Sequence, residues 1–441
     1  MSRVTEIDSS RLKIFLAFQN DPLQFVSSLL YDGDMVSLRS SRKRPAYVVN
    51  SPEFVQEILV GKDDFFIKGR SSSVLSRTIG DGLLTSEHEK HQQQRNYMQP
   101  VFYKERIQAY AETVIGEARA FADRLTDGQT LSVSDEMMKL TLTVIAQTMF
   151  ATNLEERKSE LAAAVNDTIE RSARTLFLPF ILPLGVPTPG NLVHRRAIRT
   201  LETMIYEVID DAFNHPEPYR LSLLGLLMDT KDAQGQGIPS DEMRNQMMTM
   251  LLAGHETTAN LLTWIWFSLA ENPEVEAKFH QELDHMDLTT GSAMENYRKL
   301  SYTSLIIQEA LRLYPPAWVI LRESEREVSL LGETFPPQST FLISPYALHR
   351  NKHVFKDPDV FRPERFADGI SKWPRFAYFP FGGGSRSCIG SNFAMMEATL
   401  ILAVIGKQFR FRRVDTSSVV PEPLISLRIK GGLTMAAYKH G

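Results

Sequence analysis

The sequence predicts a single large domain, residues 1–441, that is mainly α-helical and carries small β-sheets. Helical periodicity dominates from about residue 90 to 310. Strand-like segments lie on both sides of this stretch, at 35–50, 327–346 and 423–438. Because no repeat, low-complexity tract or Gly/Ser-rich linker divides the 441 residues, we expect the strands from both ends to join one helical body.

Composition excludes several classes of protein. Hydrophobic residues make up 43% of the chain, which is ordinary for a globular protein with a substantial core. The net charge of −4 comes from 49 basic and 53 acidic residues that are mixed along the chain, unlike the basic footprint of a nucleic-acid binder. The N-terminal residues 1–22 contain neither a long apolar run nor a small-residue cleavage site, so we expect no signal peptide and no membrane anchor.

The short elements near the termini follow from local signals. Residues 35–50 suggest two strands around a basic turn, and the following SPEFVQEIL predicts a helix with Ser51 as its N-cap. Towards the other end, Gly431-Gly432 favours a hairpin turn inside the strand-like segment 423–438.

The clearest predicted element is a helix from Ser240 to Glu271. Ser240 is the expected N-cap, and Asn272-Pro273 provides the stop. At 1.5 Å per residue such a helix is roughly 48 Å long and must be buried for much of its length. Its middle nevertheless reads LLAGHETTANLL, with four consecutive polar residues at 255–258. Since polar groups in a core helix are costly unless paired or functional, this turn predicts a functional site.

A glycine-rich loop, FGGGSRSCIG at 381–390, contains Cys388, which is the only cysteine in the chain. A single cysteine excludes a disulfide framework and any Cys-x-x-Cys site, and it favours a reducing, cytoplasmic compartment. The glycines allow positive φ angles and a close approach of the backbone to a flat partner. Three roles are open for Cys388 from the loop alone: an inert buried cysteine, a thiol nucleophile, and a thiolate ligand to haem iron.

The loop resembles the F-x-x-G-x-R-x-C-x-G segment that precedes the proximal helix of haem-thiolate monooxygenases, the cytochrome P-450 family. The matching residues are Phe381, Gly384, Arg386, Cys388 and Gly390. Three further motifs occur in the family's order: AGHETT at 253–258, EALR at 309–312 and FRPERF at 361–366. The resemblance extends from about residue 30 to 438, and it implies a helical domain with haem buried between the long central helix and the cysteine-loop helix.

The resemblance implies that Cys388 is the axial thiolate ligand of haem b (iron protoporphyrin IX) and that Phe381 and Gly390 belong to the cofactor-binding loop. Electron donation by the thiolate favours O–O bond cleavage and hydroxylation or epoxidation of a small lipophilic substrate. Thr257 resembles the threonine that orders a proton relay, and Glu256 resembles its acidic neighbour that takes protons from solvent. The presence of both favours a dioxygen-dependent monooxygenase. The family has no fixed role for His255.

The haem propionates need cations, and the resemblance supplies four candidates. His91 and Arg95 occupy one predicted helix, Arg322 lies in a predicted strand, and Arg386 lies in the cysteine loop. Arginine suits these contacts because its planar fork binds a carboxylate through two hydrogen bonds.

The remaining motifs are expected to be structural. The resemblance implies that Glu309, Arg312 and Arg365 form a buried ionic triad. The chain holds a second E-x-x-R copy, Glu323 to Arg326, for which we expect a surface ion pair.

The chemistry requires two electrons, for which the resemblance implies a separate ferredoxin or flavodoxin with an NAD(P)H-dependent reductase, as in a bacterial cytoplasm. A basic segment after the cysteine-loop helix is either a docking surface for an acidic partner or a solvated turn; it contains Lys407, Arg410, Arg412 and Arg413. Two other functions remain open: a hydrolase with Cys388 as nucleophile, and a haem protein that senses a ligand without turnover.

Overall fold

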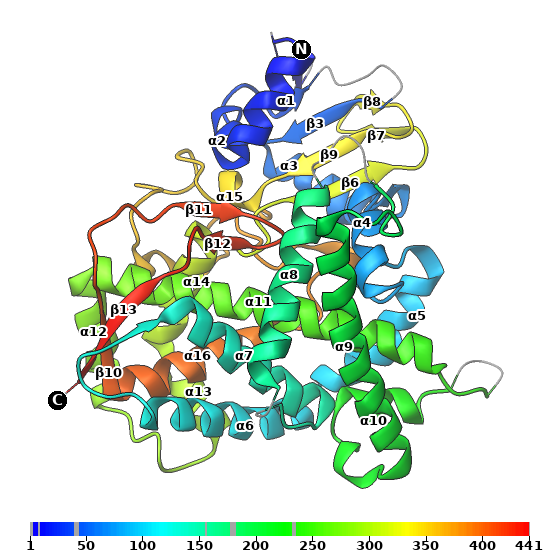
Figure 1. Ribbon diagram of the computed structural model, residues 1–441. Helices are drawn as coiled ribbons and strands as arrows, with labels where there is room; N and C mark the ends of the chain where they lie inside the picture. Colours follow the sequence, from blue (N-terminus) through cyan, green and yellow to red (C-terminus); the bar gives the residue numbers. More distant parts are fainter. Residues whose placement is uncertain are drawn as a thin grey trace. The chain divides into compact units, whose positions relative to one another are not determined.

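A computed structural model describes residues 3–7, 9–38, 44–154, 157–176, 182–231 and 235–440 (Figure 1). The chain separates into two compact units, each built from two distant stretches of sequence. Unit 1 contains residues 1–73 and 308–388, and unit 2 contains residues 74–307 and 389–441. The mainly helical class with small sheets, predicted from the sequence, is confirmed.

Unit 1 is organised around a six-stranded mixed sheet with the strand order β1-β2-β3-β9-β6-β4. Its strands are β1 (Val4–Glu6), β2 (Met35–Ser37), β3 (Ala46–Val49), β4 (Phe66–Ile67), β6 (Ile320–Ser324) and β9 (Thr340–Ile343), and β7 (Val328–Leu330) and β8 (Glu333–Phe335) form a separate hairpin. The helical segments are α1 (Arg11–Asn20), α2 (Pro22–Ser28), α3 (Pro52–Gln56), the π-helical η1 (Glu57–Gly61), α15 (Pro345–Leu348) and the 3₁₀ turns η2 (Asp63–Phe65), η5 (Pro363–Phe366) and η6 (Gly384–Arg386). Helices α4 (Arg70–Ile79) and α14 (Ser301–Leu313) cross the boundaries between the two units.

The central strands of this sheet bury aromatic and β-branched residues. β3 pairs in parallel with β9, so that Tyr47 lies opposite Phe341 and their rings stack at 5.4 Å. Phe341 also meets Phe66 and Phe335 edge to face. Such a pleated, half-buried surface is where aromatic and β-branched residues are most favourable, which explains why these short segments form strands.

Unit 2 is mostly helical. Its helices are α5 (His88–Met98), α6 (Lys104–Asp123), α7 (Val133–Phe150), α8 (Lys158–Leu176), α9 (Pro189–Asn214), α10 (Leu223–Asp229), α11 (Ser240–Glu271), α12 (Pro273–Asp284), α13 (Ala293–Lys299) and α16 (Ser391–Gln408), with 3₁₀ turns η3 (Gln99–Phe102) and η4 (Glu217–Tyr219). The strands β10 (Phe409–Arg413), β13 (Thr434–Lys439) and β5 (Gln129–Ser132) form one antiparallel sheet, and β11 (Pro421–Pro423) pairs with β12 (Leu427–Ile429).

Helix α11 is the centre of unit 2, where α7, α9, α10, α12 and α16 all contact it (Figure 1). Trp264 and Trp266 on this helix are almost completely buried. The apolar residues that precede and follow the polar turn at 255–258 therefore anchor α11 in the core, and this burial holds the polar turn in a defined position.

Local predictions near the termini had mixed outcomes. Ser51 caps α3 as predicted and accepts a hydrogen bond from the Phe54 amide at 3.3 Å. Ser240, in contrast, is the first residue of α11, and Pro239 holds the N-cap position without a side-chain hydrogen bond. The strands of segment 35–50 are present as β2 and β3, whereas residues 39–43 of the predicted basic turn lie outside the described residues.

The hairpin predicted at Gly431-Gly432 is wrong. Both glycines have positive φ, 76° and 79°, and connect β12 to β13. These two strands do not pair with each other: β12 pairs with β11, and β13 pairs with β10 and β5. The two glycines therefore redirect the chain from one sheet to another, a choice that depends on distant strands.

None of the helices in the described part of the chain combines the length and the hydrophobicity that a membrane span requires.

Candidate active site

The cysteine loop of unit 1 is closed by its own backbone. The Cys388 amide donates to the Phe381 carbonyl at 2.9 Å, and the Gly382 amide donates to the Phe379 carbonyl at 2.9 Å. Within the loop, η6 forms a single 3₁₀ turn, and the Ser387 amide donates to the Gly384 carbonyl at 3.1 Å. Cys388 follows this turn and is exposed. The loop thus presents its thiol from a defined backbone position.

The glycines of this loop are required by conformation and by space. Gly382 and Gly384 have φ values of 71° and 69°, a region that residues with a Cβ rarely adopt. A Cβ on Gly384 would overlap the carbonyl oxygen of Leu59 in η1, and a Cβ on Gly383 would overlap the ring of Phe376. The run of glycines therefore lets the loop pack directly against its own unit while Cys388 remains accessible.

Two of the predicted propionate contacts lie in the same unit as the thiol. Arg322 is on β6, is 9% exposed, and donates to the Leu321 carbonyl at 2.9 Å. Arg386 is half-buried in η6, two residues before the cysteine. The loop also lies next to β6, because a Cβ on Gly382 would stand 3.8 Å from the Ile320 side chain.

In unit 2, the polar turn of α11 has one accessible face. Between Gln246 and Trp266 all residues are buried except Ala253, Gly254 and Thr257. These three positions have the i, i+1, i+4 spacing of a single helix face. The Thr257 hydroxyl donates to the Ala253 carbonyl at 3.0 Å, the ordinary resting contact of a threonine within a helix. A long buried helix thus opens at one place, and the predicted relay threonine lies there.

Glu256 forms a buried ion pair with Arg428. Its Oε1 accepts from Arg428 Nε on β12 at 2.9 Å and from the Ser426 hydroxyl at 2.7 Å, and its side chain is 3% exposed. Arg428 in turn donates to Asn166 on α8 at 2.6 Å. Glu256 is therefore connected to protein groups, whereas the sequence analysis expected it to take protons directly from solvent.

Arg428 is a residue that sequence reasoning missed. The available signal was indirect: a carboxylate in the middle of a buried helix requires a cation somewhere in the fold. The partner lies 172 residues away in the sequence, and no spacing rule identifies it.

The surroundings of His255 indicate a role in helix packing. It is completely buried, its Nδ1 contacts the Leu251 carbonyl, and its own carbonyl accepts from Thr141 on α7 at 3.1 Å. Burial is the main cause that lowers the pKa of His255 to about 4, so that the imidazole is neutral at pH 7. This residue helps α11 pack on α7 and does not share the accessible face of Thr257.

His91 and Arg95 occupy α5 of unit 2 at the i, i+4 spacing of one helix face. His91 is 6% exposed and Arg95 is half-buried.

Gly390 lies at the N-cap of α16, where its carbonyl accepts from the Ala394 amide at 2.9 Å. Because a Cβ on Gly390 would meet Phe102 only at 3.5 Å, the structure shows no steric need for glycine at this position.

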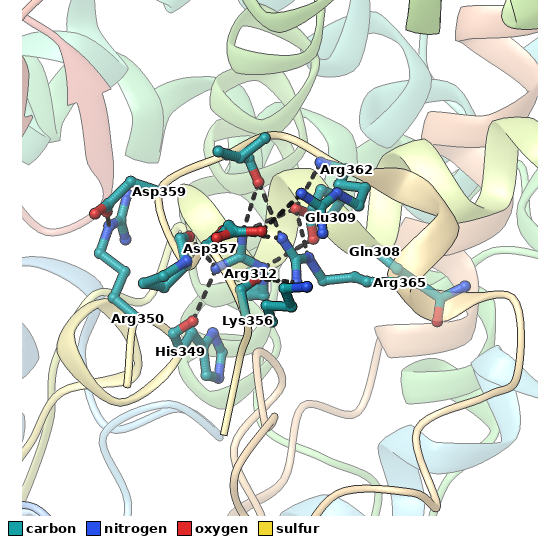
Figure 2. A network of polar contacts seen from close by, with 12 residues as sticks. Gln308, Glu309, Arg312, His349, Arg350, Lys356, Asp357, Asp359, Arg362 and Arg365 are labelled. Atoms are coloured by element: carbon teal, nitrogen blue, oxygen red, sulfur yellow. Dashed lines mark hydrogen bonds and ion pairs between the residues drawn. The ribbon is translucent and has the colours of Figure 1, made fainter. Parts of the chain in front are cut away.

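The predicted ionic triad is confirmed in unit 1 (Figure 2). Glu309 and Arg312 on α14 are completely buried and form two hydrogen bonds of 2.8 Å. Arg365 in η5 donates from Nε to Glu309 Oε1 at 2.9 Å, and the same oxygen accepts from the Arg362 amide at 2.8 Å. The guanidinium groups also donate to the backbone carbonyls of His349, Lys356, Asp357, Pro358 and Val360.

This network ties α14 to the irregular segment 349–365. The second E-x-x-R copy behaves differently from the expected pair: Arg326 bonds to Asp64 at 2.8 Å and lies over the Phe65 ring. The side chains of Arg326 and Asp64 are exposed, whereas Glu309 and Arg312 are buried, so only the copy at 309 belongs to a buried network in the described structure.

The basic segment after α16 is occupied by internal contacts. Lys407 donates to the Leu283 carbonyl, Arg412 forms two hydrogen bonds to Glu276 at 2.6 and 2.7 Å, and Arg413 bonds to Glu271 at 3.2 Å. Arg410 also donates to His440, so all four basic side chains that we considered for docking make contacts within unit 2, which favours a structural role for them.

Comparison with known proteins identifies the family. The sequence model described as Cytochrome P450 matches residues 17–434 of this chain. Relatives include Cyclooctatin synthase of Streptomyces melanosporofaciens, 38% identical over 93% of this chain and 90% of the relative. Cyclooctat-9-en-7-ol 5-monooxygenase of the same organism is 35% identical over 92% of this chain and 88% of the relative. Pentalenene oxygenase of Streptomyces avermitilis is 34% identical over 92% of this chain and 90% of the relative.

The chain belongs to the cytochrome P450 family. It is a cytochrome P450 monooxygenase, an oxidoreductase that incorporates oxygen, as predicted from the sequence motifs. This identification removes the cysteine-dependent hydrolase as an alternative.

The residues of this cytochrome P450 fit a haem-thiolate cofactor. The exposed Cys388 thiol offers one soft ligand, of the kind that haem iron binds. Glycines in its loop leave no side chain between the backbone and a flat group, and Arg322 and Arg386 of the same unit supply charge for carboxylates.

Glu397 is a second residue of this cytochrome P450 that the sequence did not reveal. It lies on α16, is completely buried, and neither of its carboxyl oxygens has a hydrogen bond of good geometry among the described residues. Burial raises the pKa of Glu397 to about 8, and the nearby Thr258 hydroxyl of α11 opposes this rise. The P450 therefore carries a neutral carboxylic acid between α16 and α11 at pH 7.

We expect Glu397 to make the stability of the P450 depend on pH. Its folded pKa lies above the ordinary value of 4.5, so the folded state keeps a proton that the unfolded chain releases between about pH 4.5 and 8. The free energy of unfolding should therefore fall as pH rises through this range, by up to about 1.4 kcal/mol per pH unit from this group. In Glu397→Gln this contribution is absent, which urea denaturation at several pH values measures.

Glu274→Gln is the matched control, because Glu274 is exposed in the first turn of α12. Its pH profile should equal that of the wild type. A Glu397→Gln profile as steep as the wild-type profile would contradict the neutral buried acid.

Proposed function

We propose that this cytochrome P450 uses dioxygen and two externally supplied electrons to hydroxylate or epoxidise a cyclic terpene. The observation that carries the proposal is the accessible face at Ala253, Gly254 and Thr257 on an otherwise buried α11. The names of two relatives support the substrate class, since one acts on cyclooctat-9-en-7-ol and another is an oxygenase of pentalenene.

The proposed cofactor is haem b with Cys388 as its axial thiolate. When bound, this group supplies the activation of dioxygen and the insertion of one oxygen atom into the substrate. Arg322, Arg386, His91 and Arg95 would hold the propionates by charge-assisted hydrogen bonds. Phe381 supports the thiol through its carbonyl, which fixes the Cys388 amide, and Gly390 follows the ligand at the start of α16.

Thr257 is proposed to hold and pass a proton on the accessible face of α11. Its hydroxyl already donates to the Ala253 carbonyl, so its oxygen lone pairs can accept a hydrogen bond from a water molecule that delivers the proton. Glu256 is the neighbouring acid, and its carboxylate is paired with Arg428.

The apolar part of the site favours a lipophilic substrate. Met250, Leu251 and Leu252 precede the accessible face on α11 and are buried. On the C-terminal side, the Ser426 hydroxyl is held by Asn260 and Glu256 and is not available as a strong polar anchor. A hydrocarbon-rich ligand loses little by entering such surroundings, whereas an ionised one would need a counter-charge.

Electrons are proposed to come from a separate ferredoxin or flavodoxin with an NAD(P)H-dependent reductase. The single cysteine excludes an iron–sulfur cluster in these 441 residues.

The test uses the haem-loaded protein with a surrogate ferredoxin and reductase. Cyclic terpenes and their monohydroxylated derivatives are first screened for displacement of the water ligand, seen as a shift of the haem spectrum. We expect NADPH-dependent formation of a product with one added oxygen. A protein that binds terpenes without NADPH-dependent product would instead be a ligand sensor, and the proposal would be wrong.

Thr257→Ala should reduce product formed per NADPH by at least about 10-fold, because positioned proton donors contribute roughly 10²–10⁴ in rate. NADPH consumption should continue and release hydrogen peroxide. Thr263→Ala is the matched control, since Thr263 on the same helix makes the same bond to the preceding turn, to the Ala259 carbonyl at 2.8 Å, but is buried. Equal coupling in the Thr257 and Thr263 variants would exclude the proton role of Thr257.

A further inference from the structure

A hollow in unit 2 is lined by residues of helix α12 and strand β10, elements that the proposed chemistry does not use. Its volume is about 340 Å³. The walls are Glu276, Ala277, His280, Gln281, Asp284 and His285 of α12 and its C-terminal end, together with Arg410 and Arg412 of β10.

The charged residues that line this hollow are Arg410, Arg412, Glu276 and Asp284. Arg412 forms two hydrogen bonds to Glu276. The hydrogen bond from His440 is the main cause that lowers the pKa of Asp284, and Lys407 lowers it further. Arg410 forms no ion pair with a carboxylate among the described residues.

Arg410 is held in place but not saturated. Its Nε donates to His440 Nδ1 at 3.0 Å, and His440 Nε2 lies 2.9 Å from Asp284 Oδ1. The two terminal nitrogens of the Arg410 guanidinium make no hydrogen bond within the part of the chain that the structure describes. They can therefore bind a ligand without breaking an existing contact.

A buried imidazole completes the wall. His280 is 2% exposed, stacks on His440 with ring centroids 4.2 Å apart, and has no hydrogen-bond partner at Nδ1. Its Nε2 is 4.0 Å from Glu276, too far for a hydrogen bond. Burial is the main cause that lowers the pKa of His280 to about 3; His440, Arg410 and Arg412 lower it further, and Asp284 opposes them.

We propose that this hollow binds a small oxyanion, a phosphate or a carboxylate group, through the terminal nitrogens of Arg410 and the imidazole of His280. A guanidinium fork with two donors matches the paired oxygens of either group. His280 is neutral and still contributes one N–H donor. The neighbouring cations disfavour a second positive charge on its ring. Glu276 and Asp284 oppose the anion less than isolated carboxylates would, because each is already bound to a cation or an imidazole. The bound anion connects β10 to α12.

The test is a calorimetric and thermal-melting titration of the haem-loaded protein with sodium phosphate and with sodium acetate, at constant ionic strength set by sodium chloride. We expect a saturable response with a rise in melting temperature. Arg410→Gln should weaken binding at least about 10-fold, since a charge-assisted hydrogen bond contributes roughly 1.5–3 kcal/mol. Arg196→Gln is the matched control: Arg196 is an exposed arginine on α9, is outside the hollow, and should leave binding unchanged.

A second pair of variants protects the test against misfolding of the Arg410 variant. Ala277 is exposed on α12 and lines the hollow, so Ala277→Glu adds a negative charge without removing an internal contact. It should abolish binding, whereas Ala277→Gln, of the same size, should retain most of it.

A response to phosphate alone assigns the site to tetrahedral anions, and a response to acetate assigns it to carboxylates; either supports the proposal. No saturable response to either ion overturns it. An equal response in the wild type, Arg410→Gln and Ala277→Glu also overturns it, because the effect would then be a general one of salt.

Discussion

Glu309→Ala is expected to cause a large loss of stability. Glu309 is the only carboxylate that bonds to the buried guanidinium groups of Arg312 and Arg365 in the described structure. Without it two positive charges remain in the core with only backbone carbonyls as acceptors. Removal of one partner of a buried ion pair costs about 3–5 kcal/mol, a large part of the roughly 5–15 kcal/mol that stabilises a typical protein.

Urea denaturation and the haem content after purification measure this effect. We expect a lower urea midpoint and a protein that is largely free of haem. Glu323→Ala is a suitable control, because Glu323 is the glutamate of the second E-x-x-R copy and is only half-buried on β6. It should change stability by less than about 1 kcal/mol. A haem-loaded Glu309→Ala protein as stable as the Glu323 variant would contradict the importance of the triad.

Cys388→Ala is expected to abolish monooxygenase activity and to remove the red-shifted Soret band of the ferrous–CO complex. The change deletes the only thiol of the chain, and no other cysteine can replace it as an iron ligand. The fold should survive, because Cys388 is exposed and its amide, not its side chain, bonds to the Phe381 carbonyl. Circular dichroism and the CO difference spectrum separate these two properties.

Thiol titration provides a readout that is independent of turnover. In haem-free wild-type protein the exposed thiol should react with a disulfide reagent, and haem should protect it from this reaction. Ser385→Ala, an exposed position in the same loop, should behave as the wild type. If Cys388→Ala keeps the wild-type CO spectrum, Cys388 is not the axial ligand.

The accuracy of the sequence predictions followed the range of the interactions behind them. The bounds of α11, Ser240 to Glu271, were predicted correctly because periodicity and the Asn272-Pro273 stop are local signals. The ion pair of Glu309 and Arg312 was expected from the resemblance of EALR to the family motif, and the i, i+3 spacing places both side chains on one face of α14. The hairpin at Gly431-Gly432 failed, since the choice of strand partner is made by β10 and β5, far away in the sequence.

The site shows the same division. Thr257 was identified from its motif, and the structure adds that it lies on the one accessible face of the middle of α11. Glu256 was identified from the same motif, but its ion pair with Arg428 was not. The ligand role of Cys388 remains a prediction that Cys388→Ala tests, and the propionate roles of Arg322, Arg386, His91 and Arg95 also remain predictions.

The sequence by itself determined the family, the long helix and the glycine-rich cysteine loop, because each depends on residue types at short, defined spacing. Only the tertiary structure decided which buried charges are paired, that Glu397 is a neutral acid between α16 and α11, and that Arg410 is left without a carboxylate. The physical reason is that burial and charge pairing depend on groups brought together by packing over more than a hundred residues, and these set the cost of a charge in the core.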